Sequence, residues 1–299
     1  MFHSTPLLAI LFVFLWNSGF IGAEYVIPYA GPFTQLFLRY LALTLILFSY
    51  LVINSRFHRP GWSTLAPTFI VGVLAHGIWL SCCLLSIQYG VPAGIVALII
   101  ALQPLTTGAL SGFIVGESTP RLRWLGLLVG FCGVALTIWA RVDFNDGTSL
   151  FAYMLPLGAV AAMTAATLIE RKLVIEKRSF TLPLRLELFY HSLASTLFLI
   201  IPATLLEGLA VQWQPRFLGG MVWLVFAVSL YAYAIMFELI KRTDATRVAS
   251  LFYLGPPVTM LMAWGLFGDT IETMDILGMA IVCIGVLFTY FPLETEKKA

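Results

Sequence analysis

The chain repeats itself at an offset of 152 residues, and no gap is needed to align the two copies. A repeat of this length indicates that two copies of one folding unit form the chain. Pairs related by the offset are Gly116-Glu117 and Gly268-Asp269, Pro104 and Pro256, Gly126 and Gly278, Gly133 and Gly285, and Leu36-Phe37 and Leu188-Phe189, with Arg39 opposite His191.

The repeated segments are long apolar blocks. Hydrophobic residues make up 60% of the chain and charged residues 11%, with a mean hydropathy of +0.94. A soluble domain carries about 25% charged residues. Blocks of about 20 apolar residues match the thickness of the hydrocarbon core at the rise of an α-helix. The sequence therefore predicts an all-α polytopic membrane protein.

Ten blocks are long enough to be transmembrane helices. They cover residues 6–26, 32–53, 65–88, 91–114, 123–140, 150–169, 182–206, 217–239, 246–267 and 275–292. The connections between them are too short for a soluble domain. We expect two five-helix repeats, residues 1–145 and 146–299, in one membrane domain.

The basic residues predict the orientation of these helices. With the N-terminus in the cytoplasm, the outside loops contain only Arg141 and Arg216. The inside loops then contain Arg56, Arg59, Arg121, Arg123, Arg171, Lys172, Lys177, Arg178, Lys241, Arg242, Lys297 and Lys298. Short loops rich in Lys and Arg stay in the cytoplasm, so both termini are predicted to be cytoplasmic.

An odd number of crossings in each repeat means that the two copies are inverted relative to each other. The loop at Gly116-Glu117 is then cytoplasmic and the loop at Gly268-Asp269 external. Inverted repeats of this kind are typical of secondary transporters, which bind their solute near the middle of the membrane. The pattern predicts alternating access around one such site.

Matching prolines interrupt the fourth and ninth blocks, at Pro104 and at Pro256-Pro257. A proline inside a helix removes a hydrogen bond and frees carbonyl groups. Such breaks at equivalent positions of two repeats indicate a binding site, with the prolines as hinges, but simple packing kinks are equally compatible with them. Gln103, beside Pro104, favours a polar cavity.

Arg39 is the most informative single residue, because it lies about seven residues into the second block. An arginine at the centre of a membrane helix costs about 2.5–3.5 kcal/mol on insertion scales. We therefore expect it to face the bundle interior, where it could bind a solute carboxylate or phosphate. It could instead pair with Glu24 or extend to the outer interface.

Two histidines lie near the middle of their blocks. His76 is in the third, and His191 is in the seventh, one helical turn from Glu187. A carboxylate and an imidazole on one helix face could carry protons, so Glu187 and His191 are candidates for a proton relay. For His76, a packed core histidine is the competing interpretation.

The remaining features predict no cofactor. The four cysteines Cys82, Cys83, Cys132 and Cys283 lie inside apolar blocks and lack the spacing of a metal site. The net charge of +2 gives no indication of nucleic-acid binding. Glycines spaced by four, at Gly108, Gly112 and Gly116 and at Gly126 and Gly130, predict close helix packing, either internal or in a homodimer.

Several of these segments resemble a known family. Gln103-Pro104-Leu105, Gly116-Glu117, Trp124-Leu125-Gly126, Gly130 and Gly133-Val134 follow one another as in the EamA family of the drug/metabolite transporter (DMT) superfamily. Trp16-Asn17-Ser18-Gly19-Phe20 and Phe37-Leu38-Arg39-Tyr40 resemble its first and second helices. The second copy is similar but looser, with Asp269 where Glu is usual.

The resemblance implies ten helices in two inverted halves, and export of amino acids or other small metabolites across a bacterial inner membrane. Carried over by position, the implied cavity residues are Trp16, Asn17, Phe20, Arg39, Gln103 and Pro104, with Tyr253 near the break in the second copy. The residues themselves add His76 and Trp79 as candidates for the solute site.

Two other interpretations remain open at this point. The chain could be an intramembrane enzyme that uses Glu187, His191 and His76 as acid–base groups. It could also be a DMT transporter of another solute class, such as a drug or a nucleotide sugar. The expected partners are a small-molecule solute, the lipid bilayer and, for the glycine-rich faces, a second copy of the chain.

The inverted repeat makes a direct topological prediction. In a variant without the four native cysteines, single cysteines placed just after Glu117 and just after Asp269 should react with an impermeant thiol reagent from opposite sides of the membrane. Labelling of both positions from one side would contradict the inverted arrangement.

Overall fold

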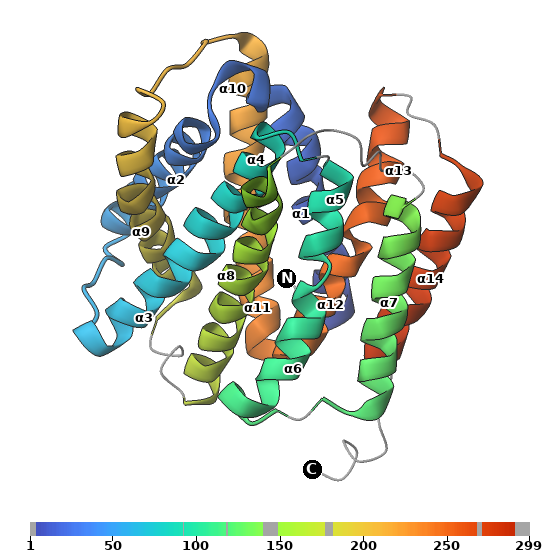
Figure 1. Cartoon of the computed structure of the whole chain (residues 1–299). Coiled ribbons are helices and arrows are strands. Elements are labelled where there is room, and N and C mark those ends of the chain that lie inside the picture. Colours follow the sequence, from blue (N-terminus) through green and yellow to red (C-terminus); the bar gives the residue numbers. More distant parts are fainter. Residues whose placement is uncertain are drawn as a thin grey trace.

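The computed structural model describes residues 4–91, 93–117, 119–139, 149–176, 182–267 and 271–290. Helices follow one another along these residues (Figure 1). In chain order they are α1 (Thr5–Val26), η1 (Ile27–Tyr29), α2 (Pro32–Ile53), α3 (Trp62–Gly72), η2 (Val73–Ile78), α4 (Trp79–Gln88), α5 (Ala93–Ile100), α6 (Gln103–Val115), α7 (Arg121–Trp139), α8 (Leu150–Ile175), α9 (Leu184–Leu205), α10 (Pro215–Trp223), η4 (Leu224–Ala232), α11 (Tyr233–Arg242), α12 (Ala245–Ser250), η5 (Leu251–Leu254), α13 (Gly255–Phe267) and α14 (Thr273–Tyr290).

The prediction of an all-α polytopic membrane protein is confirmed. Among the described residues, seven continuous helical stretches are long and apolar enough to cross a membrane, and Thr273–Thr289 is a shorter apolar helix. The stretches are Thr5–Tyr29, Pro32–Ile53, Trp62–Gln88, Leu150–Ile175, Leu184–Leu205, Pro215–Arg242 and Ala245–Leu266. The count of ten crossings stays a prediction.

The helix breaks differ in detail from the predicted kinks. Pro104 does not interrupt a continuous helix. A turn at Ala101–Leu102 separates α5 from α6, and Pro104 lies in the first turn of α6. Pro256 likewise follows the first residue of α13, after the 3₁₀-helical turn η5. The first turn of a helix has no acceptor for its N–H groups, so a residue without an N–H is tolerated there.

Two further segments depart from α-helical winding where the sequence predicted plain helices. Residues Val73–Ile78 and Leu224–Ala232 are π-helical. π-Helical turns occur frequently at functional sites, because the extra residue per turn redirects side chains. They place His76 and Ser229 inside the bundle, where both are buried.

The element boundaries follow the 152-residue offset. Adding 152 to α2, Pro32–Ile53, gives 184–205, which are the bounds of α9, Leu184–Leu205. The same shift of α6, Gln103–Val115, gives the bounds of α13, Gly255–Phe267. Shifting η2 from 73–78 to 225–230 places it within η4.

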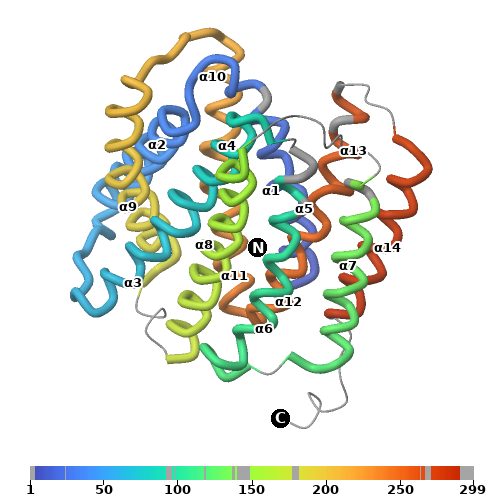
Figure 2. Tube along the Cα trace, viewed as in Figure 1, coloured from blue at the N-terminus to red at the C-terminus, as the bar shows by residue number. Residues whose placement is uncertain are grey.

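Related helices also pack against each other. The tube in Figure 2 shows α7 beside α14 at one side of the bundle, and α2 beside α9 at the other. Thr44 of α2 and Thr196 of α9, which are 152 residues apart, place their Oγ1 atoms 3.3 Å from each other. A residue in contact with its own repeat counterpart lies on the two-fold axis that would relate the copies.

Glycines on α7 and α14 bring these two helices together. A Cβ on Gly126 would lie 2.6 Å from the carbonyl oxygen of Gly285, and one on Gly133 would lie 2.9 Å from that of Gly278. The two contacts exchange under the repeat offset. The predicted close packing through the α7 glycines is therefore internal to the chain, and it requires the absence of side chains.

At the α10 end of the bundle, the loop between α9 and α10 packs against the start of α2 (Figure 1, top). Both carboxylate oxygens of Glu207 accept hydrogen bonds there, from the backbone N–H groups of Phe33 (3.1 Å) and Thr34 (2.7 Å). The negative charge caps the N-terminus of α2, where unpaired N–H groups and the helix dipole favour it.

The predicted boundary between the repeats near residue 145 lies outside the described residues, as do Gly268-Asp269, Arg141, Lys177, Arg178, Lys297 and Lys298. The division into residues 1–145 and 146–299 therefore stays a prediction, and so does the side of the membrane on which each end lies.

The α7–α14 contact predicts the effect of adding one methyl group. In Gly285→Ala, the new Cβ would lie 2.4 Å from the backbone nitrogen of Gly130, so the helices must separate. We expect a loss of about 1–3 kcal/mol in unfolding free energy, and hence a lower thermal midpoint in detergent.

Gly112→Ala is the matched control, because the nearest atom to its Cβ would be 3.9 Å away. Its thermal midpoint should equal or exceed that of the wild type. Equal midpoints for Gly285→Ala and Gly112→Ala would contradict the proposed role of the glycine contact.

Candidate functional site

Arg39 is buried in the middle of the bundle with a positive charge that no described carboxylate neutralises. Its side chain is 5% exposed, and its Nε donates a hydrogen bond to Ser229 Oγ at 2.5 Å. Nη2 has no hydrogen-bond partner among the described residues. The side chain of Glu24, the pairing partner considered from the sequence, lies outside the described residues. A buried guanidinium of this kind is ready to accept an anionic group.

An aromatic layer lies next to Arg39. The ring of Trp16 contacts those of Trp79 (5.4 Å between centroids), Tyr233 (4.8 Å) and Phe252 (5.1 Å). These rings come from α1, α4, α11 and η5. Two predicted site residues, Trp16 and Trp79, therefore meet in space although 63 positions separate them in the chain. Together the rings form an apolar wall in the bundle interior.

His76 connects the aromatic layer to Arg39. Its Nδ1 lies 3.1 Å from the hydroxyl of Tyr40, and its ring lies 3.8 Å from that of Tyr233. Tyr40 is adjacent to Arg39, whose Cζ lies 5.6 Å from the Tyr40 ring centroid. The Nε2 of His76 is buried without a partner among the described residues. This histidine offers a second polar group to a bound solute.

His191 lies beside His76, and Glu187 lies one turn earlier on α9. The two imidazole rings are 5.7 Å apart, and neither nitrogen of His191 has a hydrogen-bond partner among the described residues. Glu187 forms an ion pair with Lys241 of α11. Glu187 is therefore engaged by a cation, while His191, one turn further along α9, contacts the central cluster. The role of the pair as a relay stays a prediction.

The two helix breaks contribute two polar side chains, and Asn17 of α1 lies beside the second break. Gln103, at the start of α6, is completely buried, and neither its Oε1 nor its Nε2 has a partner among the described residues. The hydroxyl of Tyr253 in η5 is in the same situation. Asn17 donates to the Val13 carbonyl at 2.6 Å and accepts a long bond of 3.5 Å from Thr259.

Phe20 lies apart from the other predicted site residues. Its ring is 49% exposed on the surface of α1, whereas Trp16 and Asn17 are buried. Phe20 follows Trp16 by four positions, so the residues lie on nearly the same side of α1, but the Phe20 side chain is half exposed. Pro104 and Pro257 are buried and Pro256 is partly buried, and their role as hinges stays a prediction.

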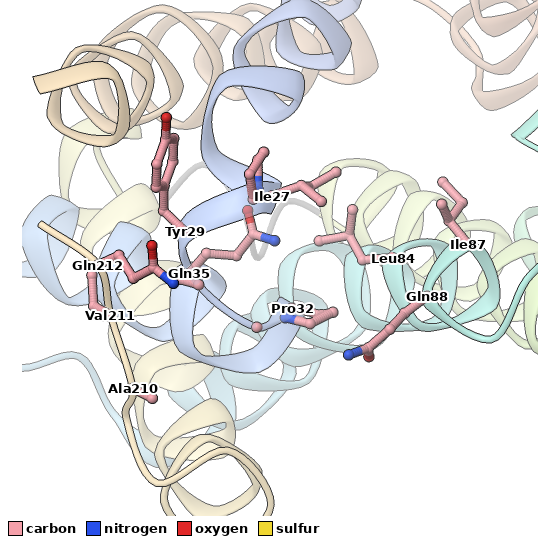
Figure 3. A pocket seen from close by; sticks show the side chains of 13 residues that line it. Ile27, Tyr29, Pro32, Gln35, Leu84, Ile87, Gln88, Ala210, Val211 and Gln212 are labelled. Carbon is pink, nitrogen blue, oxygen red and sulfur yellow. The ribbon is translucent and has the colours of Figure 1, made fainter. Parts of the chain in front are cut away.

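A cavity of about 580 Å³ opens at the α10 end of the bundle. Its lining comes from the α1–α2 connection, the end of α4 and the segment Ala210–Gln212. Figure 3 shows the side-chain amide of Gln35 between Ile27 and Leu84. Gln35 is one turn of α2 from Arg39, about 6 Å along the helix axis. Its Nε2 is also buried without a described partner, and among the lining residues Gln35 is the nearest to Arg39 along α2.

The opposite end is closed by ion pairs. Arg171 of α8 binds Glu117 at 2.6 Å and the Ile240 carbonyl at 3.0 Å. The other oxygen of Glu117 accepts the N–H of Ala245, the first residue of α12, at 3.3 Å. Nearby, Arg123 of α7 binds Asp244 at 3.0 Å. These contacts tie elements from both copies of the repeat across this end.

Sequence reasoning missed three members of the central cluster, namely Tyr40, Ser229 and Tyr233 as partners of Arg39 and His76. Tyr40 could have been found from its place next to Arg39. Ser229 had no signal, because only the π-helical winding of η4 turns it toward α2. Among the described residues, no group of three or more His, Cys, Asp or Glu side chains could hold a metal ion.

Comparison with known sequences identifies the family of the chain. The sequence profile of the EamA-like transporter family matches twice, at residues 3–139 and 150–291. A probable amino-acid metabolite efflux pump of Salmonella typhimurium is 23% identical, over 98% of this chain and 96% of its own length. The uncharacterized inner membrane transporter YedA of Escherichia coli is also 23% identical, over 94% of this chain and 90% of its own.

A solved crystal structure with 16% sequence identity superposes with a TM-score of 0.78, covering 96% of both chains. At this identity the likeness concerns the fold.

The central contacts predict a measurable stability effect. Tyr40→Phe removes the hydroxyl that meets His76 and leaves a buried polar nitrogen without that partner. We expect about 1 kcal/mol of lost unfolding free energy, seen as a lower thermal midpoint in detergent. Tyr231→Phe is the control, because Tyr231 is exposed on the bundle surface. If both variants melt alike, the hydroxyl makes no stabilising contact.

Proposed function

Because the chain belongs to the EamA-like transporter family, we propose that it exports amino acids, hydrophobic and aromatic ones among them, across a bacterial inner membrane by alternating access. Membership of a transporter family also removes the interpretation as an intramembrane enzyme. The protein is a multi-pass membrane transporter of a small-molecule solute. The solute class, the mechanism and the membrane are our proposal.

The observation that carries the solute class is the unneutralised charge of Arg39. Its guanidinium has one hydrogen bond, to a neutral hydroxyl, and an Nη2 without a described partner. A carboxylate is the group that complements it, through charge-assisted and bidentate hydrogen bonds. The names of two similar proteins, both probable amino-acid metabolite efflux pumps, agree with a carboxylate-bearing solute.

The surroundings of Arg39 favour solutes with an apolar side chain. Trp16, Trp79 and Tyr233 form a wall of rings next to the arginine, and aromatic walls bind apolar and ring-bearing groups. His76, Asn17, Gln103 and Tyr253 supply the hydrogen-bonding groups for the remainder of the solute. We assign these residues, with Arg39, to the solute site, and leave Phe20 outside it because its ring faces away.

A nucleotide sugar or another phosphate ester is the weaker alternative. Its two or more negative charges would need several cations at the site. Among the described residues, the arginine side chains that are nearly fully buried are Arg39 and Arg123, and Arg123 is bound to Asp244. One available guanidinium matches one carboxylate better than a diphosphate.

We further propose that residues 1–145 and 146–299 are inverted halves that rock about the central site. The matching helix bounds, the Thr44–Thr196 contact and the exchanged glycine contacts support a two-fold relation between them. Both termini are then cytoplasmic, and the cavity of about 580 Å³ opens to the outside.

In this mechanism the structure represents a state that is closed toward the cytoplasm. Opening toward the cytoplasm requires separation of Glu117 from Arg171 and of Arg123 from Asp244, since these pairs bridge the two halves. The breaks before Pro104 and before Pro256 and Pro257 supply the hinges. Glu187 and His191 are the candidates for proton coupling, with His76 beside His191 as the link to the solute.

The proposal predicts that Arg39→Ala abolishes transport. In liposomes that contain the purified protein, wild type should move radiolabelled L-phenylalanine down its gradient, and the variant should show the flux of empty liposomes. Insertion should be retained, because the substitution removes a charge that costs about 2.5–3.5 kcal/mol in a membrane helix.

Arg56→Ala is the control, since Arg56 lies exposed in the loop between α2 and α3. Its flux should match the wild type. Unchanged flux in Arg39→Ala would show that the arginine is structural. A thermal-shift series with amino acids, amines and nucleotide sugars tests the solute class separately, because a ligand raises the midpoint of the state that binds it. Stabilisation by nucleotide sugars alone would contradict export of amino acids.

A further inference from the structure

A second cavity lies on the membrane-facing surface, apart from the solute site. Its volume is about 660 Å³, and its walls come from α1, α10 and α13. Four large apolar side chains along it, Phe14, Tyr25, Trp223 and Leu266, are 39–66% exposed. In a protein that crosses the membrane, exposed apolar side chains of transmembrane helices can face lipid chains, so this groove is accessible to lipid.

Glycines form the floor of the groove. A Cβ on Gly220 would lie 2.7 Å from Val26, and one on Gly22 would lie 3.1 Å from Trp223, so α1 and α10 are in close contact at these positions. Gly219 faces the open side, because a Cβ there would have no atom within 4 Å. Trp223 is held beside the floor by a hydrogen bond of 3.0 Å from its indole N–H to Ser18. The groove is therefore shaped by ordered packing.

The length of the groove matches one leaflet. Along α1 it extends from Phe14 to Tyr25, which corresponds to about 16 Å at the helical rise. Half of the hydrocarbon core of a bilayer is about 15 Å thick. An acyl chain that lies in the groove would thus span the leaflet at the α10 end of the bundle.

A cation stands at the end of the groove where the headgroup of such a lipid would be. Arg216, the second residue of α10, belongs to the lining and is exposed. No ion pair of Arg216 occurs among the described residues. Arginine binds phosphate through two parallel hydrogen bonds, and basic residues beside apolar grooves recognise anionic lipids.

We propose that this groove is a binding site for one anionic phospholipid, with an acyl chain over Gly219 and the phosphate on Arg216. The lipid fills a gap between the α1–α10 pair and α13. Helix α13 follows the break before Pro256. The lipid would therefore support the helix that the proposed transport cycle moves, while binding itself is independent of the solute.

Native mass spectrometry of the full chain tests the site. The probe is phosphatidylglycerol, compared with a diacylglycerol of the same chains that lacks the phosphate. Wild type should retain one phosphatidylglycerol. Gly219→Leu should bind it about tenfold more weakly, because the new side chain occupies the groove. Arg216→Gln should bind it about tenfold more weakly and lose the preference over diacylglycerol.

Gly265→Leu is the matched control, because a Cβ on this glycine of α13 also meets no atom within 4 Å, and Gly265 is not part of the lining. It should bind as the wild type does. Equal binding by the two leucine variants, or an unchanged preference in Arg216→Gln, would overturn the proposal.

Two other occupants would appear in the same spectra. A dimer that Gly219→Leu dissociates would show that a second copy of the chain covers the groove. Competition by glycerol phosphate at the same concentration as the lipid would show a site for free phosphate. Either result would also overturn the proposal, and neither depends on whether the protein transports amino acids.

Discussion

Hydrocarbon offers no hydrogen bonds, and the rest of the structure depends on this constraint. Every polar group at membrane depth needs a partner inside the protein or a polar cavity. The backbone satisfies it by forming helices. Arg39 satisfies it only in part, with one bond to Ser229 and one nitrogen left over. Burying a charged arginine costs free energy, and the hydrogen bonds of Arg39 remain incomplete. This combination favours a site that binds another molecule.

The same constraint applies to the irregular parts of the bundle. The winding is π-helical at Val73–Ile78 and Leu224–Ala232, and α-helical winding is interrupted before Pro104 and before Pro256. Each of the four segments contributes a buried polar side chain, namely His76, Ser229, Gln103 and Tyr253. Close helix contact through Gly126, Gly133 and their counterparts on α14 encloses the bundle interior, because backbones without side chains can approach to van der Waals distance.

Residue types predicted which side chains would be buried together in the bundle interior, while their role in binding a solute stays a prediction. Trp16, His76, Trp79 and Arg39 are each unusual at membrane depth, and they converge. Phe20 resembled them in sequence, but its side chain is half exposed at the surface of α1. Ser229 is an ordinary residue in sequence, and only its position on a π-helical turn makes it the partner of Arg39. The pairing of Glu187 with Lys241 could not be predicted either, because the two residues belong to different helices.

The sequence by itself determined the membrane class, the helix positions and the repeat, because apolar block length and a fixed residue offset are one-dimensional properties. Proline alone did not determine the breaks, because Pro104 and Pro256 follow a break, whereas Pro67, Pro156 and Pro202 lie inside helices. Tertiary structure decided which polar groups meet: Arg39 with Ser229, His76 with Tyr40, Glu117 with Arg171. It also decided that one end is closed by ion pairs while the other holds a cavity. Contacts between helices depend on how each helix is rotated about its axis and how it is wound. Small changes in packing determine both properties, and residue spacing does not encode them.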